Sequence, residues 1–101
     1  MKYQLVLQWP SETTDADFET LCRTERLVRL LPFGNQVDGH DIGSGEANIF
    51  ILTNDPLGCF EQVKAILESH PIWKGRVAYR EESGENYVVV WPKGLRNFRV
   101  I

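Results

Sequence analysis

The segment EANIFILT, residues 46–53, constrains the fold most, because it is apolar at positions that point in opposite directions. Successive side chains of a β-strand alternate between the two faces of its sheet, so Ile49 and Ile51 share one face and Phe50 lies on the other. A strand that is apolar on both faces is typical of the centre of a sheet whose faces are both covered. We therefore expect residues 46–53 to form either a central strand or a strand whose outer face is covered by another part of the chain.

One neighbour of this segment is residues 35–43, NQVDGHDIG, because the Gly-Ser-Gly that joins them is typical of the turn of a β-hairpin. The turn holds either three residues or two, and a slip of one residue moves every side chain to the other face. With three residues, His40 shares a face with Glu46 and Asn48. With two residues, Asp41 takes that place.

Hydrophobic periodicity and turn residues predict the other elements of the chain. We expect strands at residues 2–9, 35–43, 46–53, 76–82 and 87–92, and helices within residues 11–32 and 54–70. The first six elements match the split β-α-β, or ferredoxin-like, arrangement. The sequence therefore predicts an α+β fold, a ferredoxin-like β-α-β-β-α-β unit with an additional C-terminal hairpin strand. Its antiparallel sheet carries two helices on one face, and residues 1–101 form a single α+β domain.

Both helices have typical first residues. Thr14 is the predicted N-cap of the first helix, with the acidic Asp17 three residues later. Asp55 is the predicted N-cap of the second helix, and Pro56 takes its first position, where a missing N–H costs nothing. The buried side of the first helix is expected from residues with helical spacing: Phe18, Leu21, Cys22, Val28 and Leu31.

Composition excludes several classes of protein. A net charge of −3 argues against nucleic-acid binding. No apolar run approaches the roughly 18 residues of a membrane span, and the N-terminal apolar stretch is too short for a signal peptide. We therefore expect a cytoplasmic protein with no membrane association and no cofactor, in which Cys22 and Cys59 are reduced core residues. The basic Lys93, Arg96 and Arg99 of the tail form either a small basic patch or a solvated end, and the solvated end is the preferred interpretation.

The predicted hairpin carries most of the candidate binding residues: Asp38, His40, Asp41, Glu46 and Asn48. In the three-residue register, His40 beside Glu46 forms a general acid–base pair. The spacing matches no zinc or calcium loop, so we expect no metal, and we assign no catalytic residue. The structural interpretation is that the glycines form the turn and a bulge at Gly39, while the carboxylates keep the sheet edge soluble.

Trp73 is a further candidate binding residue. It lies in the predicted loop HPIWKGR beside Lys74 and Arg76. An exposed tryptophan next to cations is typical of a hot spot for protein binding. The structural alternative is a tryptophan that folds over the edge of the core.

Two functions fit these observations. The first is a small soluble protein-interaction or regulatory module, not an enzyme, such as an immunity-type inhibitor that acidic residues steer onto a basic partner. The alternative is a small-ligand-binding or enzymatic ferredoxin-like domain, in which two sheets pair around a pocket that uses His40 and Glu46. The apolar faces of residues 46–53 and 87–92 also favour self-association, as a homodimer through the sheet.

Overall fold

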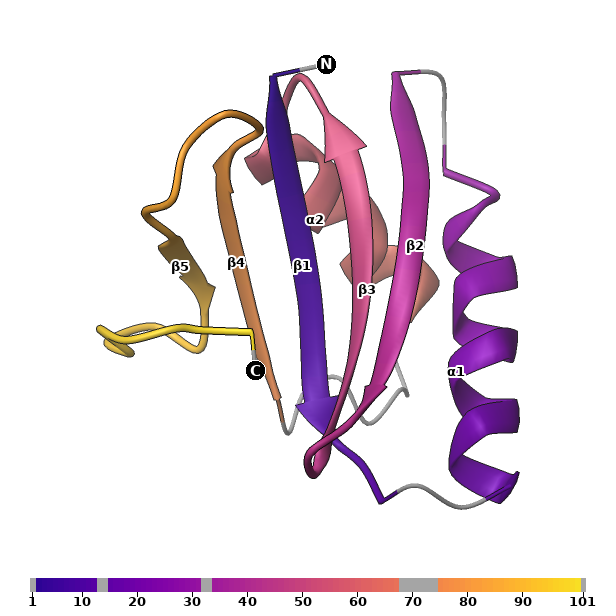
Figure 1. The fold of residues 1–101 in the computed structure, drawn as a ribbon. Helices are drawn as coiled ribbons and strands as arrows, with labels where there is room; N and C mark the ends of the chain where they lie inside the picture. The colour runs from indigo at the N-terminus through magenta and orange to yellow at the C-terminus, as the bar shows by residue number, and fades with distance from the viewer. Residues whose placement is uncertain (1, 13–14, 32–33, 68–74, 101) are drawn as a thin grey trace.

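The computed structural model describes residues 2–12, 15–31, 34–67 and 75–100 (Figure 1). Within these residues the chain is an α+β structure with a five-stranded antiparallel sheet and two helices. The elements are β1 (Tyr3–Pro10), α1 (Asp15–Val28), β2 (Asn35–Gly43), β3 (Glu46–Thr53), α2 (Pro56–Ile66), β4 (Arg76–Glu81) and β5 (Val88–Trp91). The α+β class and the order of elements agree with the sequence prediction.

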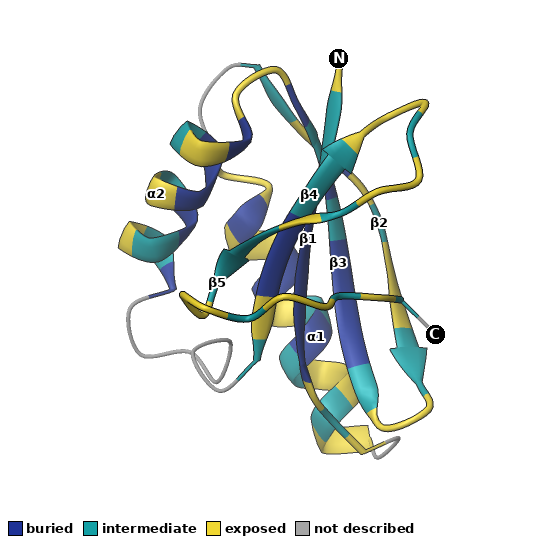
Figure 2. Cartoon of the chain, turned by 90° about the vertical axis from the view of Figure 1, so that its left-hand side faces the viewer, coloured by how far each residue is buried: buried dark blue, intermediate teal, exposed yellow. Residues whose placement is uncertain are grey.

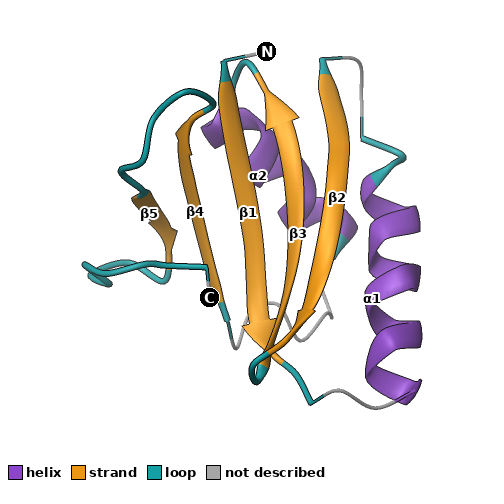
Figure 3. Cartoon of the chain, viewed as in Figure 1, coloured by secondary structure: helices purple, strands orange, loops and turns teal. Residues whose placement is uncertain are grey.

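The strands lie in the order β2-β3-β1-β4-β5 (Figure 3). The segment that is apolar on both faces, β3, pairs with β1 on one side and with β2 on the other, as the sequence predicts. The pairing of β1 with β3 and with β4 aligns Leu5 with Ile51 and with Tyr79. The additional strand β5 extends the sheet at the free edge of β4.

One face of the sheet forms the hydrophobic core together with both helices. Leu5 and Leu7 of β1 and Ile49 and Ile51 of β3 are completely buried on this face. Helix α2 lies behind the sheet, and α1 lies along β2 (Figure 1). The buried sides of both helices face inward (Figure 2), and both helices contribute side chains to the same cluster: Leu21 and Val28 of α1, and Cys59, Phe60 and Val63 of α2.

The structure confirms the predicted start of α2 and corrects one residue predicted to be buried in α1. Asp55 is the N-cap of α2 and accepts a hydrogen bond from the Gly58 backbone N–H at 3.0 Å. The predicted N-cap Thr14 lies outside the described residues. The prediction that Phe18 is buried is wrong: 47% of it is exposed, since it lies on the side of α1 that reaches His40.

The opposite face of the sheet is covered at its centre by the C-terminal tail, residues 95–100. Val6 and Ala78 on this face are completely buried. The Gln8 side chain donates a hydrogen bond from Nε2 to the Arg99 carbonyl at 3.0 Å, which fixes the tail across the sheet (Figure 2). The apolar surface expected to pair two copies is therefore partly covered within one chain, and the homodimer stays a prediction.

Candidate functional site

The β2–β3 hairpin has the two-residue turn. Ser44 and Gly45 form it, and both have positive φ values, 53° and 83°, as a type I′ turn requires. Gly43 pairs with Glu46, so Asp41, Glu46 and Asn48 share one face of the sheet. The three-residue register, which joined His40 to Glu46, is wrong.

The two-residue turn also places His40 on the other face: it pairs with Ile49 and lies on the helix-facing side of the sheet. A β-bulge follows at the middle of β2, in agreement with the prediction at Gly39. Val37 pairs with Ile51 and Gly39 pairs with Phe50, so β2 advances two residues while β3 advances one. Because of the extra residue, Val37 lies on the same side of the sheet as His40.

On the helix side, His40 meets a carboxylate that the sequence analysis did not identify, Glu25 of α1. His40 Nδ1 and Glu25 Oε2 form a hydrogen bond, and Arg29 Nη2 donates to Glu25 Oε1 at 2.6 Å. Only 12% of the Glu25 side chain is exposed, against 56% for Arg29 and 35% for His40. The group therefore consists of one buried anion held by two partly exposed bases.

The charge state of Glu25 follows from its surroundings. Burial raises the pKa of its carboxyl, but the hydrogen bonds from Arg29 and His40 outweigh burial, so the pKa lies below that of an ordinary glutamic acid. Glu25 is thus ionised at neutral pH. An ionised carboxylate can only accept hydrogen bonds, so His40 Nδ1 carries the proton and donates it to the bond. The carboxylate fixes the imidazole and links β2 to α1.

The sequence does contain a signal that Glu25 is buried and needs partners. Glu25 lies four residues after Leu21 and three before Val28, inside the buried side of α1. A glutamate at such a position requires partners that offset the loss of hydration. Its pairing with Arg29 follows the spacing i, i+4, whereas the contact with His40 depends on the register of the hairpin formed by β2 and β3.

The other candidate residues lie apart from Glu25. Asn48 is buried on the tail-facing side, where its Oδ1 accepts a hydrogen bond from Gln8 Nε2 at 3.0 Å. Among the described residues, its Nδ2 has no hydrogen-bond partner. Asp38 and Asp41 are exposed on β2. Trp73 lies outside the described residues.

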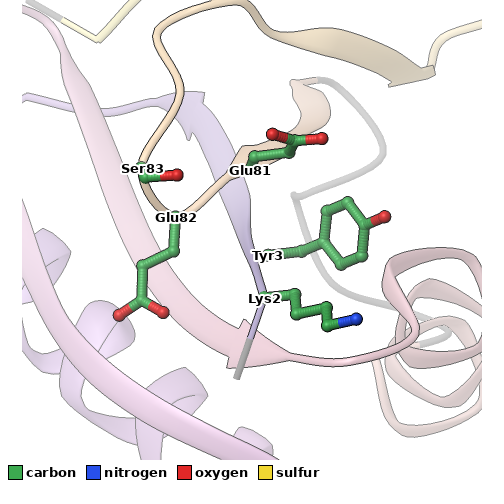
Figure 4. Close-up of a pocket in the computed structure, with 5 residues that line it drawn as sticks. All are labelled: Lys2, Tyr3, Glu81, Glu82 and Ser83. Atoms are coloured by element: carbon green, nitrogen blue, oxygen red, sulfur yellow. The ribbon is translucent and has the colours of Figure 1, made fainter.

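A pocket of about 450 Å³ lies at the start of β1 and the end of β4 (Figure 4). Its lining side chains are those of Lys2, Tyr3, Glu81, Glu82 and Ser83. Lys2 and Glu82 are joined through the backbone, Glu82 N–H to Lys2 carbonyl at 2.8 Å, while their side chains point away from each other (Figure 4). The polar groups of this pocket do not converge on one point, which a specific ligand site requires.

Cys59 is buried in the core, as predicted, and Cys22 is partly exposed. Burial raises the pKa of the Cys59 thiol to about 12, so it has little thiolate character at neutral pH. No three His, Cys, Asp or Glu side chains among the described residues are placed to hold a metal ion. No helix in the described part of the chain is long and apolar enough to cross a membrane.

Comparisons of the chain with known protein families, with curated proteins and with solved structures found no match.

Proposed function

We propose that this chain is a protein-binding module whose contact surface is an acidic edge, formed by Asp38 and Asp41 of β2 with Phe18 of α1. The observation that carries the proposal is that both carboxylates are exposed on an outer strand and form no ion pair within the described residues. Such carboxylates attract a basic partner over distances of about 10 Å at moderate salt. Inhibition of a basic enzyme, in the manner of an immunity protein, is one role for this surface.

Phe18 supplies an apolar contact on the helix side of the same edge, next to His40. It is 47% exposed, and its ring lies edge-on to the His40 ring, with 6.2 Å between the ring centroids. Aromatic side chains contribute a large share of the binding energy in protein interfaces. A surface that combines an exposed ring with unpaired carboxylates suits a partner with both basic and apolar groups.

The group around Glu25 favours a rigid contact surface. Glu25 of α1 binds His40, which follows Asp38 by two residues and precedes Asp41 by one. Holding β2 against α1 before a partner arrives reduces the entropy lost on binding.

The alternative, a ligand-binding or enzymatic domain that uses His40 and Glu46, has less support. The two residues lie on opposite faces of the sheet, and the carboxylate beside His40 is Glu25. The tail also occupies part of the face on which two sheets would enclose a pocket.

Three finer expectations join this proposal. The order β2-β3-β1-β4, with α1 between β1 and β2 and α2 between β3 and β4, supports the ferredoxin-like arrangement. Two free cysteines support a cytoplasmic location, where thiols stay reduced. Self-association through the uncovered part of the sheet is the third expectation.

The test is quantitative capture of partners from a lysate of the source organism. The bait is the tagged chain, compared in parallel with the variant D38K/D41K and with the control E81K/E82K. The control makes the same change of charge at exposed positions at the end of β4. The proposal predicts a stoichiometric partner that the control retains and D38K/D41K loses. A partner that is retained by D38K/D41K contradicts the assignment of the surface.

A further inference from the structure

Three arginines surround an open pocket of about 670 Å³ on the side of the sheet that carries the tail. Arg76 is the first residue of β4, and Arg96 and Arg99 belong to the tail. Arg76 precedes Arg96 by 20 residues and Arg99 by 23 residues, so only the fold brings the three together. The interpretation of the basic tail as a merely solvated end is therefore incomplete.

The local structure explains how the tail reaches Arg76. After β5, a turn reverses the chain: the Leu95 N–H donates to the Pro92 carbonyl at 3.3 Å, and Gly94 has a φ of +89°, which favours glycine. The tail then crosses the sheet, and Gln8 binds the Arg99 carbonyl. Gln8 is the pairing partner of Arg76, so this hydrogen bond places Arg99 next to Arg76.

The pocket is positively charged in a protein of net negative charge. Arg76, Arg96 and Arg99 line it together with one carboxylate, Glu85, so the formal charge of these four side chains is +3 − 1 = +2. None of the three arginines forms an ion pair with a carboxylate of the described residues. An arginine guanidinium offers five N–H donors in a planar fork that matches phosphate oxygens. Three unpaired guanidiniums around one space are suited to a ligand with several phosphate groups.

Two aromatic rings form another wall of the pocket. The rings of Tyr87, from the β4–β5 connection, and Phe98, from the tail, lie 4.9 Å apart between centroids. Rings of this kind offer a surface on which a nucleobase stacks. The volume of the pocket falls within the roughly 300–1,000 Å³ typical of sites for small ligands.

We propose that this pocket binds a nucleoside polyphosphate. The phosphates bind to Arg76, Arg96 and Arg99, and the base stacks against the wall of Tyr87 and Phe98. The site is separate from the acidic edge, so it adds a small-molecule ligand to a module proposed to bind protein.

The test is a binding titration of the full chain with ATP and GTP, followed by calorimetry, with tripolyphosphate and a single-stranded oligonucleotide as further probes. The variant R96Q/R99Q removes two guanidiniums but keeps the backbone carbonyl that binds Gln8. F98L removes the ring, and K93Q is the control, because Lys93 lies in the turn just before the tail and does not line the pocket. Circular dichroism establishes that each variant is folded.

The expected result is saturable binding of a nucleoside triphosphate that weakens at least about tenfold in R96Q/R99Q, because hydrogen bonds between charged groups are lost. K93Q binds as the wild type does. F98L weakens triphosphate binding by about fivefold or more and leaves tripolyphosphate binding unchanged. No saturable binding at millimolar nucleotide, or equal binding by R96Q/R99Q, overturns the proposal. Much tighter binding of the oligonucleotide than of either nucleotide overturns it in favour of a nucleic-acid site.

Discussion

Replacement of His40 by alanine tests the link between β2 and α1. His40 donates a hydrogen bond from Nδ1 to Glu25, a carboxylate of which 12% is exposed. In the variant, Arg29 is the one remaining partner of this buried carboxylate among the described residues. We therefore expect His40→Ala to destabilise the fold, although the imidazole lies at the surface side of the group.

The size of the effect follows from the contact. A hydrogen bond to a charged group contributes about 1.5–3 kcal/mol to stability. Since 35% of the His40 side chain is exposed, water replaces part of the lost bond, and we expect a loss of about 1–2 kcal/mol. In a domain of this length, each 1 kcal/mol lowers Tm by roughly 4–8 °C.

The assay is urea unfolding of the wild type, H40A, E25Q and the double variant H40A/E25Q. Residues in direct contact show a coupling energy of about 0.5 kcal/mol or more, so the double variant loses less stability than the sum of the two single variants. Asp41→Ala, at the exposed neighbouring position, is the control and changes stability by less than about 0.5 kcal/mol. Additive effects of H40A and E25Q refute the link.

The ion pair of Glu25 also makes the stability of the protein depend on pH, and E25Q tests this dependence. The pKa of Glu25 is lower in the folded protein than in the unfolded chain. Its contribution to stability is therefore complete above the ordinary glutamate pKa of about 4.3 and is lost as the pH falls through the lower, folded value. In E25Q this part of the acid destabilisation is absent, so the difference in stability between the wild type and E25Q shrinks as the pH falls below the ordinary glutamate pKa. A constant difference from neutral to strongly acidic pH contradicts the account.

Three further predictions concern the core, a helix start and a close contact. Iodoacetamide labels Cys22 before Cys59 in the native protein, because Cys59 is buried and its pKa is raised to about 12; equal labelling before unfolding contradicts this. Asp55→Ala removes the N-cap of α2 and lowers stability by about 1 kcal/mol, seen as a lower midpoint in urea, whereas an unchanged midpoint speaks against the cap. Gly75→Ala would place a methyl group 1.9 Å from the Gln8 carbonyl oxygen, so we expect a loss of at least about 1–3 kcal/mol; a normal Tm refutes that close approach.

The sequence predicted the elements well because their signals are local. The alternation in residues 2–9 and the two apolar faces of residues 46–53 depend only on neighbouring residues in the strand. The N-cap Asp55 and the following Pro56 marked the start of α2 for the same reason. Local patterns therefore sufficed for the positions and the order of the elements.

The candidate site was predicted less well because its geometry depends on two details of the hairpin. The turn length decided whether His40 or Asp41 would face Glu46, and the sequence allowed both. The bulge at Gly39 then placed Val37 on the same side of the sheet as His40. The contact with Glu25 joins two elements 15 residues apart in the sequence, and no local pattern contains it.

The arginine pocket could not be predicted from the sequence, for a different reason. Arg96 and Arg99 lie close together in the sequence, but their neighbour in the pocket, Arg76, belongs to β4. The path of the tail depends on the turn at Gly94 and on the hydrogen bond from Gln8, and neither is visible as a periodic pattern.

The measurement that tests the proposed function most directly is a backbone amide NMR titration of the labelled chain with the partner obtained by capture. Protein binding through the acidic edge predicts chemical-shift changes that concentrate at Phe18 and at Asp38–Asp41 and that the variant D38K/D41K abolishes. Changes confined to β4, β5 and the tail would contradict the account, because they would place the protein contact at the opposite edge of the sheet.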